Sequence, residues 1–240
     1  MNYYNAGYII ISYENELIYK GCTLQGLSDT IVSISNLVRP TFPDYWFFPW
    51  CNKSENNTIS NLINSRLKIS LDEHVKAQSF LETLIQEKIF SWPNVFKCLK
   101  DAMYFKECYL KGLKNLSIVS LSLSEEYQKD FLLNEEQEND FDVSIYDLLK
   151  DSRPFQIEDN EVLGFDICGY SNNAFYSFIC NGLQSDFKRF GKQLNSLSLI
   201  ENYKDAQEII HLIDQGEIRA EEILWYPWLV TKCKEMHCVS

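Results

Sequence analysis

The stretch Glu161–Leu183, EVLGFDICGYSNNAFYSFICNGL, decides the fold that we expect for this chain. A run rich in β-branched and aromatic residues from 162 to 170 precedes the turn Ser171-Asn172-Asn173, and an aromatic run follows from 174 to 179. Because asparagine tolerates positive φ, a two-residue asparagine turn between such runs favours a β-hairpin. Cys180-Asn181-Gly182 then leads into a helical pattern.

The composition is that of a folded protein. The chain has 240 residues, of which 45% are hydrophobic and 14% aromatic. Disordered chains have few aromatic residues and low hydrophobicity, so this chain can bury a sizeable core. We expect a single compact domain over residues 1–240, in which residues 1–112 can form a subdomain beside residues 113–240.

Acidic charge is concentrated in one short segment. The formal net charge is -12, and residues 125–161 alone hold 13 Asp/Glu against 3 Lys/Arg. Residues 1–124 hold 11 Asp/Glu against 12 Lys/Arg, so they are almost neutral. Such a field repels nucleic acid and anionic membranes and attracts basic partners. A solvated acidic loop that only aids solubility is the simpler interpretation of this segment taken alone.

The cysteine usage predicts a reduced, cytoplasmic protein without cofactors. None of the eight cysteines lies in a CxxC motif, and the chain has only three histidines, which argues against a closed zinc site. The N-terminus lacks the basic and long apolar regions of a signal peptide. No apolar run reaches the ~18 residues that span a bilayer. We therefore expect free thiols, no metal and no membrane association.

The first half of the chain predicts a hairpin and two helices. Gly7–Tyr13 is β-prone, and Leu17–Cys22 is expected to pair with it. Ser70 and Glu73 form a capping box that opens a helix to about Ile89. The expected apolar stripe of this helix consists of Leu71, Val75, Leu81, Leu84, Ile85 and Ile89. A second helix is expected to run to about Leu110, and its expected core consists of Val95, Phe96, Leu99, Ala102, Met103 and Phe105.

The second half predicts further strands and helices. Apolar residues alternate with serine from Asn115 to Leu123, which indicates a strand with one buried face. Helices are expected after Ser124, before Arg153, and from Asn202 to Gly216. The segment Trp225–Val230, WYPWLV, is expected to lead into a short last strand. The fold class is therefore α+β, with a mixed or antiparallel central sheet flanked by several amphipathic helices.

Catalytic motifs are missing from the sequence. It contains no P-loop, GxGxxG, GxSxG or HExxH pattern. Cys180 at a helix start is a conceivable nucleophile with His211 as its base, but a buried structural cysteine is the better interpretation. The carboxylates that could form an acid pair or bind Mg²⁺ alternate only loosely with apolar residues; they are Glu158, Asp159, Glu161 and Asp166.

Residues 116–230 resemble a family of small bacterial proteins that are found beside polymorphic toxins. The resemblance rests on an ordered series of segments. These are Val162–Asp166, Phe175–Leu183, Asn195, the pair Leu199-Ile200, Ala206 and Ala220–Val230, of which the last reads AEEILWYPWLV.

This resemblance implies an immunity protein of a contact-dependent growth inhibition or polymorphic toxin system. Such a protein is not an enzyme; it binds and neutralises a cognate toxin C-terminal domain, for example a basic nuclease. An acidic inhibitor gains fast, steered association with a basic toxin. The candidate toxin-binding residues are Glu135, Glu136, Glu138, Asp140 and Asp142. The residues expected to define the fold rather than the contact are Gly164, Cys180, Asn181, Trp225, Pro227 and Trp228.

Two alternatives from other classes stay open. A cytosolic adaptor could bind a cellular protein through the aromatic segment 41–51, TFPDYWFFPWC, although packing of this loop over the core is the simpler expectation. An enzyme could use Cys180 or the carboxylates near Asp166. We rank immunity first, the adaptor second and the enzyme third.

Overall fold

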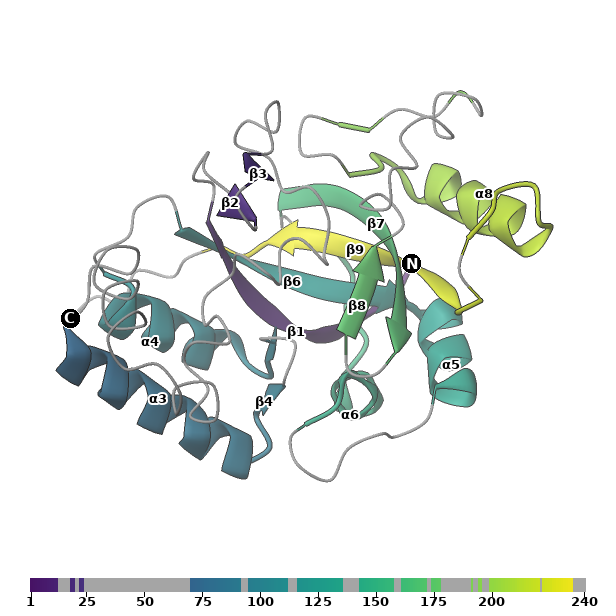
Figure 1. The fold of residues 1–240 in the computed structure, drawn as a ribbon. Helices are drawn as coiled ribbons and strands as arrows, with labels where there is room; N and C mark the ends of the chain where they lie inside the picture. Colours follow the sequence, from purple (N-terminus) through teal and green to yellow (C-terminus); the bar gives the residue numbers. More distant parts are fainter. Residues whose placement is uncertain are drawn as a thin grey trace.

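The chain forms an antiparallel sheet with helices packed on both faces, as the computed structural model shows (Figure 1). This confirms the predicted α+β class, and of the two sheet types that the sequence allowed, the antiparallel one is present. The structure describes residues 1–12, 18–19, 22–23, 70–91, 95–111, 116–135, 143–157, 161–171, 174–177, 191, 194–195, 199–220 and 222–234.

The strands and helices alternate irregularly along the chain. The strands are β1 (Tyr3–Ser12), β2 (Ile18–Tyr19), β3 (Cys22–Thr23), β4 (Phe90–Ser91), β5 (Val95–Phe96), β6 (Leu116–Ser124), β7 (Glu161–Ser171), β8 (Ala174–Ser177) and β9 (Trp225–Lys232). The helices are α3 (Leu71–Gln86), α4 (Leu99–Tyr109), α5 (Glu125–Asn134), α6 (Ile145–Asp151) and α8 (Tyr203–Asp214).

The main sheet has the strand order β4-β5-β1-β6-β9-β7-β8, and all its pairs are antiparallel. β1 pairs with β6 along almost its whole length, so residues 1–112 and 113–240 contribute strands to the same sheet. The predicted hairpin is confirmed, because Ser171 of β7 pairs with Ala174 of β8. β9 lies between β6 and β7 and joins this hairpin to the rest of the sheet.

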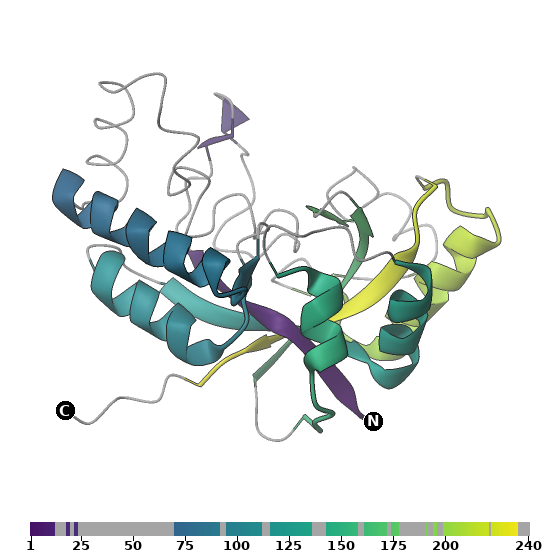
Figure 2. The ribbon, with the colours of Figure 1, turned by 90° about the horizontal axis from the view of Figure 1, so that it is seen from below.

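Apolar side chains cover both faces of the sheet. On one face, α5 and α6 pack over the centre, where Phe131 of α5 contacts Trp228 of β9. On the opposite face, α3 and α4 cover Ile118 of β6, whereas α8 covers Leu229 of β9. Figure 2 shows the resulting arrangement, with α3 and α4 at one end of the molecule and α5 and α8 at the other.

The helix starts that were predicted from capping residues at Ser70 and Asn202 are confirmed. Ser70 and Glu73 form the reciprocal capping box of α3, and the Asn202 side chain accepts a hydrogen bond from the backbone N–H of Asp205 at the start of α8. Gly216 follows α8 with a φ of +73°, the left-handed conformation that ends helices. These caps satisfy N–H groups that have no partner inside a helix.

Two details of the first helical pair differ from the prediction. Val95 and Phe96 are buried as expected, but they form β5 instead of the start of a helix, because Phe96 pairs with Tyr8 of β1. The helix α4 begins only at Leu99. In α3, Val75 is 51% exposed and Ala77 is buried, so the inward face is rotated relative to the predicted stripe.

The serines of β6 were expected to face solvent, but the strand is buried on both faces from Ser117 to Ser124. Ser120 and Thr231 share a hydrogen bond of 2.5 Å between their hydroxyls, and Ser124 shares one of 2.9 Å with the Tyr203 hydroxyl. Alternation with serine therefore marks a buried polar seam, not a solvated face.

Two strand predictions also differ from the structure, one in the partner of the strand and one in its extent. Within the described residues, β2 pairs with β3 in a separate small sheet and not with β1. The WYPWLV segment does not merely lead into the last strand; it forms most of β9. Proline has no N–H group to donate, so it is tolerated where one edge of a strand is unpaired. Pro227 meets this condition, because it pairs with β7 on one edge, whereas β6 pairs only with residues 229–232 of β9.

A bulge in β7 centres on Gly164, where a short segment docks against the strand. The register of β7 on β9 shifts between Val162 and Gly164, and Gly164 has a φ of +141°. Phe165 and Ile200 exchange backbone hydrogen bonds of 2.7 and 2.8 Å, and the Asn195 amide donates to the Leu163 carbonyl at 2.6 Å. A Cβ atom on Gly164 would lie 2.8 Å from the Ile200 carbonyl oxygen.

We expect Gly164→Ala to lower the free energy of unfolding by roughly 3 kcal/mol, because it combines a left-handed backbone with a steric clash. Gly216→Ala is the matched control, since its φ is also positive but a Cβ atom there meets nothing within 4 Å. Urea unfolding of the two variants measures the difference. Equal losses would show that the contact with Ile200 does not constrain β7.

Candidate functional site

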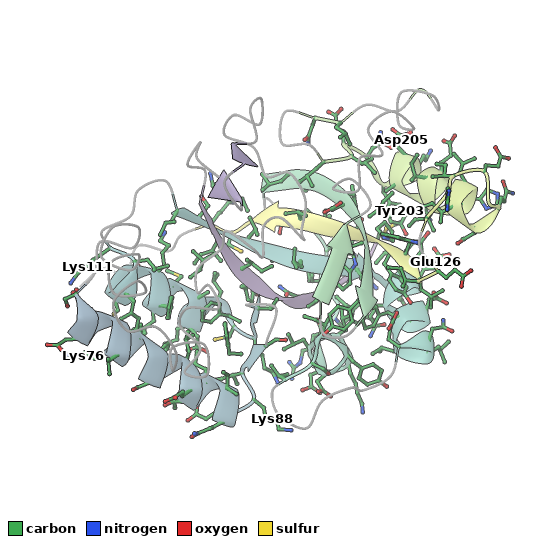
Figure 3. All side chains as sticks on the ribbon, in the orientation of Figure 1. Lys76, Lys88, Lys111, Glu126, Tyr203 and Asp205 are labelled. Carbon is green, nitrogen blue, oxygen red and sulfur yellow. The ribbon has the colours of Figure 1, made fainter. Side chains whose placement is uncertain are left out.

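The two ends of the molecule differ in charge. Residues 70–111, which include α3 and α4, hold six acidic and six basic residues. Residues 125–135 of the α5 region hold four acidic residues against Lys129, and residues 201–222 of the α8 region hold seven against two. In Figure 3, the labelled Lys76, Lys88 and Lys111 lie at the first end, whereas Glu126 and Asp205 lie at the second. We call the α5 and α8 region the acidic end.

A cluster of tyrosines joins α5 to α8 at the acidic end. The rings of Tyr127 and Tyr203 are perpendicular with centroids 6.3 Å apart, and the Tyr203 hydroxyl bonds to Ser124 at the start of α5. Burial raises the pKa of Tyr127 to about 12, with smaller contributions from Tyr203 and the carboxylates of Glu126 and Asp214. The tyrosines therefore stay neutral at physiological pH and fix the two acidic helices beside each other.

The outer face of α5 presents carboxylates beside one exposed apolar side chain. Glu126, Asp130 and Leu133 follow at spacings of four and three residues and share one face of the helix. Leu133 is 84% exposed. Lys129 is paired with Glu125 at 2.7 Å, and within the described residues neither Glu126 nor Asp130 forms an ion pair. This face is therefore negatively charged and carries an apolar residue.

The hydroxyl of Tyr226 is buried beneath the C-terminal end of α5. Tyr226 is 1% exposed, and its hydroxyl has no hydrogen-bond partner among the described residues. Burial raises the pKa of Tyr226, and the nearby carboxylates of Glu135 and Asp130 raise it further. The carboxylate of Glu135 therefore lies close to this hydroxyl. A buried polar group without a partner is costly, so this position is a candidate for a functional role.

The predicted toxin-binding residues are only partly within the described structure. Glu135 is half-buried at the C-cap of α5, where its backbone N–H bonds to the Phe131 carbonyl oxygen. The other four candidates, Glu136, Glu138, Asp140 and Asp142, lie outside the described residues. Sequence reasoning missed Leu133, Tyr226 and the acidic residues of α8, because aromatic and helical patterns alone do not distinguish a surface position from a core position.

The predicted fold-defining residues that the structure describes lie in β7 and β9. Gly164 forms the β7 bulge, Trp225 and Trp228 are buried, and the Trp228 indole donates to the Cys168 carbonyl at 3.2 Å. Pro227 pairs with Ile167 across the strands. Cys180 and Asn181 lie outside the described residues.

The residues weighed for catalysis are not brought together in the described structure. His211 is exposed on α8 and bonds to Gln215 at 2.8 Å, while Cys180 and the aromatic segment 41–51 lie outside the described residues. Asp166 is fully buried in β7, opposite Trp228. A search of the described residues finds no group of three or more His, Cys, Asp or Glu side chains placed to hold a metal ion.

Comparisons with known proteins identify no relative of this chain. No protein-family model matches the sequence, no curated protein is similar to it, and no solved structure matches the fold. Among the described helices, none combines the length and apolar character required to cross a membrane.

Tyr226→Phe should stabilise the free protein by about 1 kcal/mol, because it removes a buried hydroxyl that lacks a partner. Tyr203→Phe is the matched control and should destabilise it by a similar amount, because it leaves the buried Ser124 hydroxyl without its 2.9 Å partner. Thermal and urea unfolding measure whether each variant is more or less stable than the wild type. A clear loss of stability in Tyr226→Phe would mean that its hydroxyl is satisfied in the free protein.

Proposed function

We propose that this chain is an immunity protein, a cytoplasmic inhibitor that binds and neutralises a basic toxin domain through its acidic end. The observation that carries the proposal is the charge asymmetry of the fold. The α3–α4 end is balanced, whereas the α5 and α8 regions together hold 11 acidic and three basic residues. The resemblance of residues 116–230 to proteins found beside polymorphic toxins supports the same function.

The physical basis of inhibition is charge complementarity. A toxin domain that acts on nucleic acid needs lysines and arginines that hold phosphates. Carboxylates on a rigid surface compete for the same side chains and also accelerate encounter with the toxin. The tyrosine contacts between α5 and α8 hold the two helices in place, so little backbone entropy is lost on binding.

The direct test is rescue of growth. The open reading frame immediately upstream should encode a protein whose C-terminal domain is toxic when expressed in a sensitive host. Co-expression of this chain should restore growth, and the two proteins should elute together in gel filtration, with an association rate that falls as salt rises. Toxicity without rescue and without a complex would refute the proposal.

Charge-reversal variants test where the toxin binds. Glu126→Lys/Glu217→Lys should lower the association rate about tenfold at low salt, because both residues lie at the acidic end. Glu87→Lys/Glu107→Lys makes the same change in net charge at the α3–α4 end. This control should lower the association rate less than about twofold. Equal effects of the two pairs, measured by stopped-flow fluorescence, would show that only net charge matters and not the acidic end.

A further inference from the structure

An open groove lies beside the C-terminal end of α8, where the chain folds back toward β9 (Figure 1). Its volume is about 560 Å³. The residues that line it include three isoleucines and three charged residues, which are Ile213, Ile218, Ile223, Asp214, Arg219 and Glu222. The groove therefore combines apolar walls with charge at the acidic end.

The backbone at the end of α8 fixes one part of the groove. The N–H of Gly216 donates to the Ile213 carbonyl at 2.9 Å. The N–H groups of Glu217 and Ile218 donate to the Leu212 carbonyl at 3.0 and 3.2 Å. Such bonds, with positive φ at Gly216, end the helix and turn the chain sharply. Ile218 is buried in the core under α8, whereas Ile213 is half-buried and borders the groove.

Another wall, Ile223, rests on the backbone of β7. A Cβ atom added to Gly169 would collide with the Ile223 side chain, so the lack of a side chain at Gly169 makes room for Ile223. Gly169 pairs with Trp225 of β9, two residues beyond Ile223. The walls of the groove are therefore built by the fold, and little ordering is needed when a ligand binds.

The charges around the groove are mostly negative. Residues 213–223 hold four acidic residues and one basic residue, Arg219. Asp214 and Glu222 are exposed, and neither forms an ion pair with a described residue. An apolar groove with a negative rim suits a ligand that is both apolar and basic.

We infer that this groove binds a basic segment of a protein partner. An apolar side chain of that segment lies between the isoleucines, and its lysines or arginines lie beside Asp214 and Glu222. The inference deepens the proposed function, on which it rests, by naming the kind of segment that the acidic end recognises. The overall charge steers the partner, and the apolar groove determines where it docks.

The charge of the groove favours this occupant over others. Nucleic acid and anionic membranes are repelled by the carboxylates. A second copy of this chain would bring a net charge of -12 toward the same carboxylates. A neutral apolar molecule would gain nothing from Asp214 and Glu222.

The test uses the full chain and three acetylated and amidated peptides, KKLLKK, KKSSKK and EELLEE. In an NMR titration at about 0.15 M salt, KKLLKK should shift the backbone amide signals of residues 213–223 and bind at least about threefold more tightly than KKSSKK. EELLEE should bind about tenfold or more weakly than KKLLKK, because its charge matches that of the rim. Equal affinity of KKLLKK for KKSSKK or EELLEE, shifts confined to other residues, or no binding of KKLLKK would overturn the inference.

Matched variants locate the binding of KKLLKK. Ile223→Ser removes an apolar wall and should weaken binding about threefold or more, whereas Leu224→Ser, at a position that is 45% exposed and does not line the groove, should weaken it less than about twofold. Circular dichroism checks that both variants are folded.

A second pair of variants keeps the hydrophobic walls intact. Asp214→Asn/Glu222→Gln should weaken binding of KKLLKK about threefold or more, and Glu126→Gln/Asp130→Asn makes the same charge change on α5 and should weaken it less than about twofold. Equal weakening in these two double variants would show that the peptide responds to net charge and not to the groove.

The outcomes also distinguish this inference from the proposed function. If growth rescue succeeds and both Ile223→Ser and Asp214→Asn/Glu222→Gln rescue as well as the wild type, the groove is not the docking site and the immunity function stands. If KKLLKK binds selectively in the groove but the upstream domain is neither toxic nor bound, the groove stands and the immunity function falls.

Discussion

The pairing of β1 with β6 is the constraint on which the rest of the structure depends. It runs from Tyr3 opposite Ser124 to Ser12 opposite Leu116, and it joins the first residues of the chain to its middle. On its other edge β1 carries β5, and the helix α4 contacts β1 itself. Without the pairing of β1 with β6, the strands β4–β5–β1 and the strands β6–β9–β7–β8 would not share a sheet.

The same pairing explains why both faces of the sheet are buried. β6 has a partner strand on each edge. The helices α5 and α6 cover one face of the sheet, and the helices α3, α4 and α8 cover the other. The serines of β6 are therefore enclosed, and two of them find partners in Thr231 and Tyr203. Enclosure fixes the geometry of these two hydroxyls, whereas the buried hydroxyl of Ser122 has no partner among the described residues.

Local sequence signals predicted the elements whose physics is local. The capping box at Ser70, the cap at Asn202 and the hairpin pairing of β7 with β8 depend on neighbouring residues, and all three are present. Val95 and Phe96 were assigned to a helix because burial alone does not separate a short strand from a helix; their pairing with β1 comes from residues far away in the chain.

The candidate site was predictable only in part for the same reason. The acidic run that begins at Glu135 is visible in the sequence, because charged residues can be identified without knowing what they contact. The buried Tyr226 hydroxyl is not, because its environment is built by β9 and α5, which lie 90 residues apart in the chain.

A basic partner should bind to the acidic end of the molecule. Hydrogen–deuterium exchange of the full chain, alone and with the C-terminal domain of the upstream protein, measures this most directly. Binding at the acidic end should slow exchange in peptides that cover residues 124–135 and 203–220, and should leave peptides from α3 and α4 unchanged. Protection confined to residues 71–109, with residues 124–135 unchanged, would contradict it.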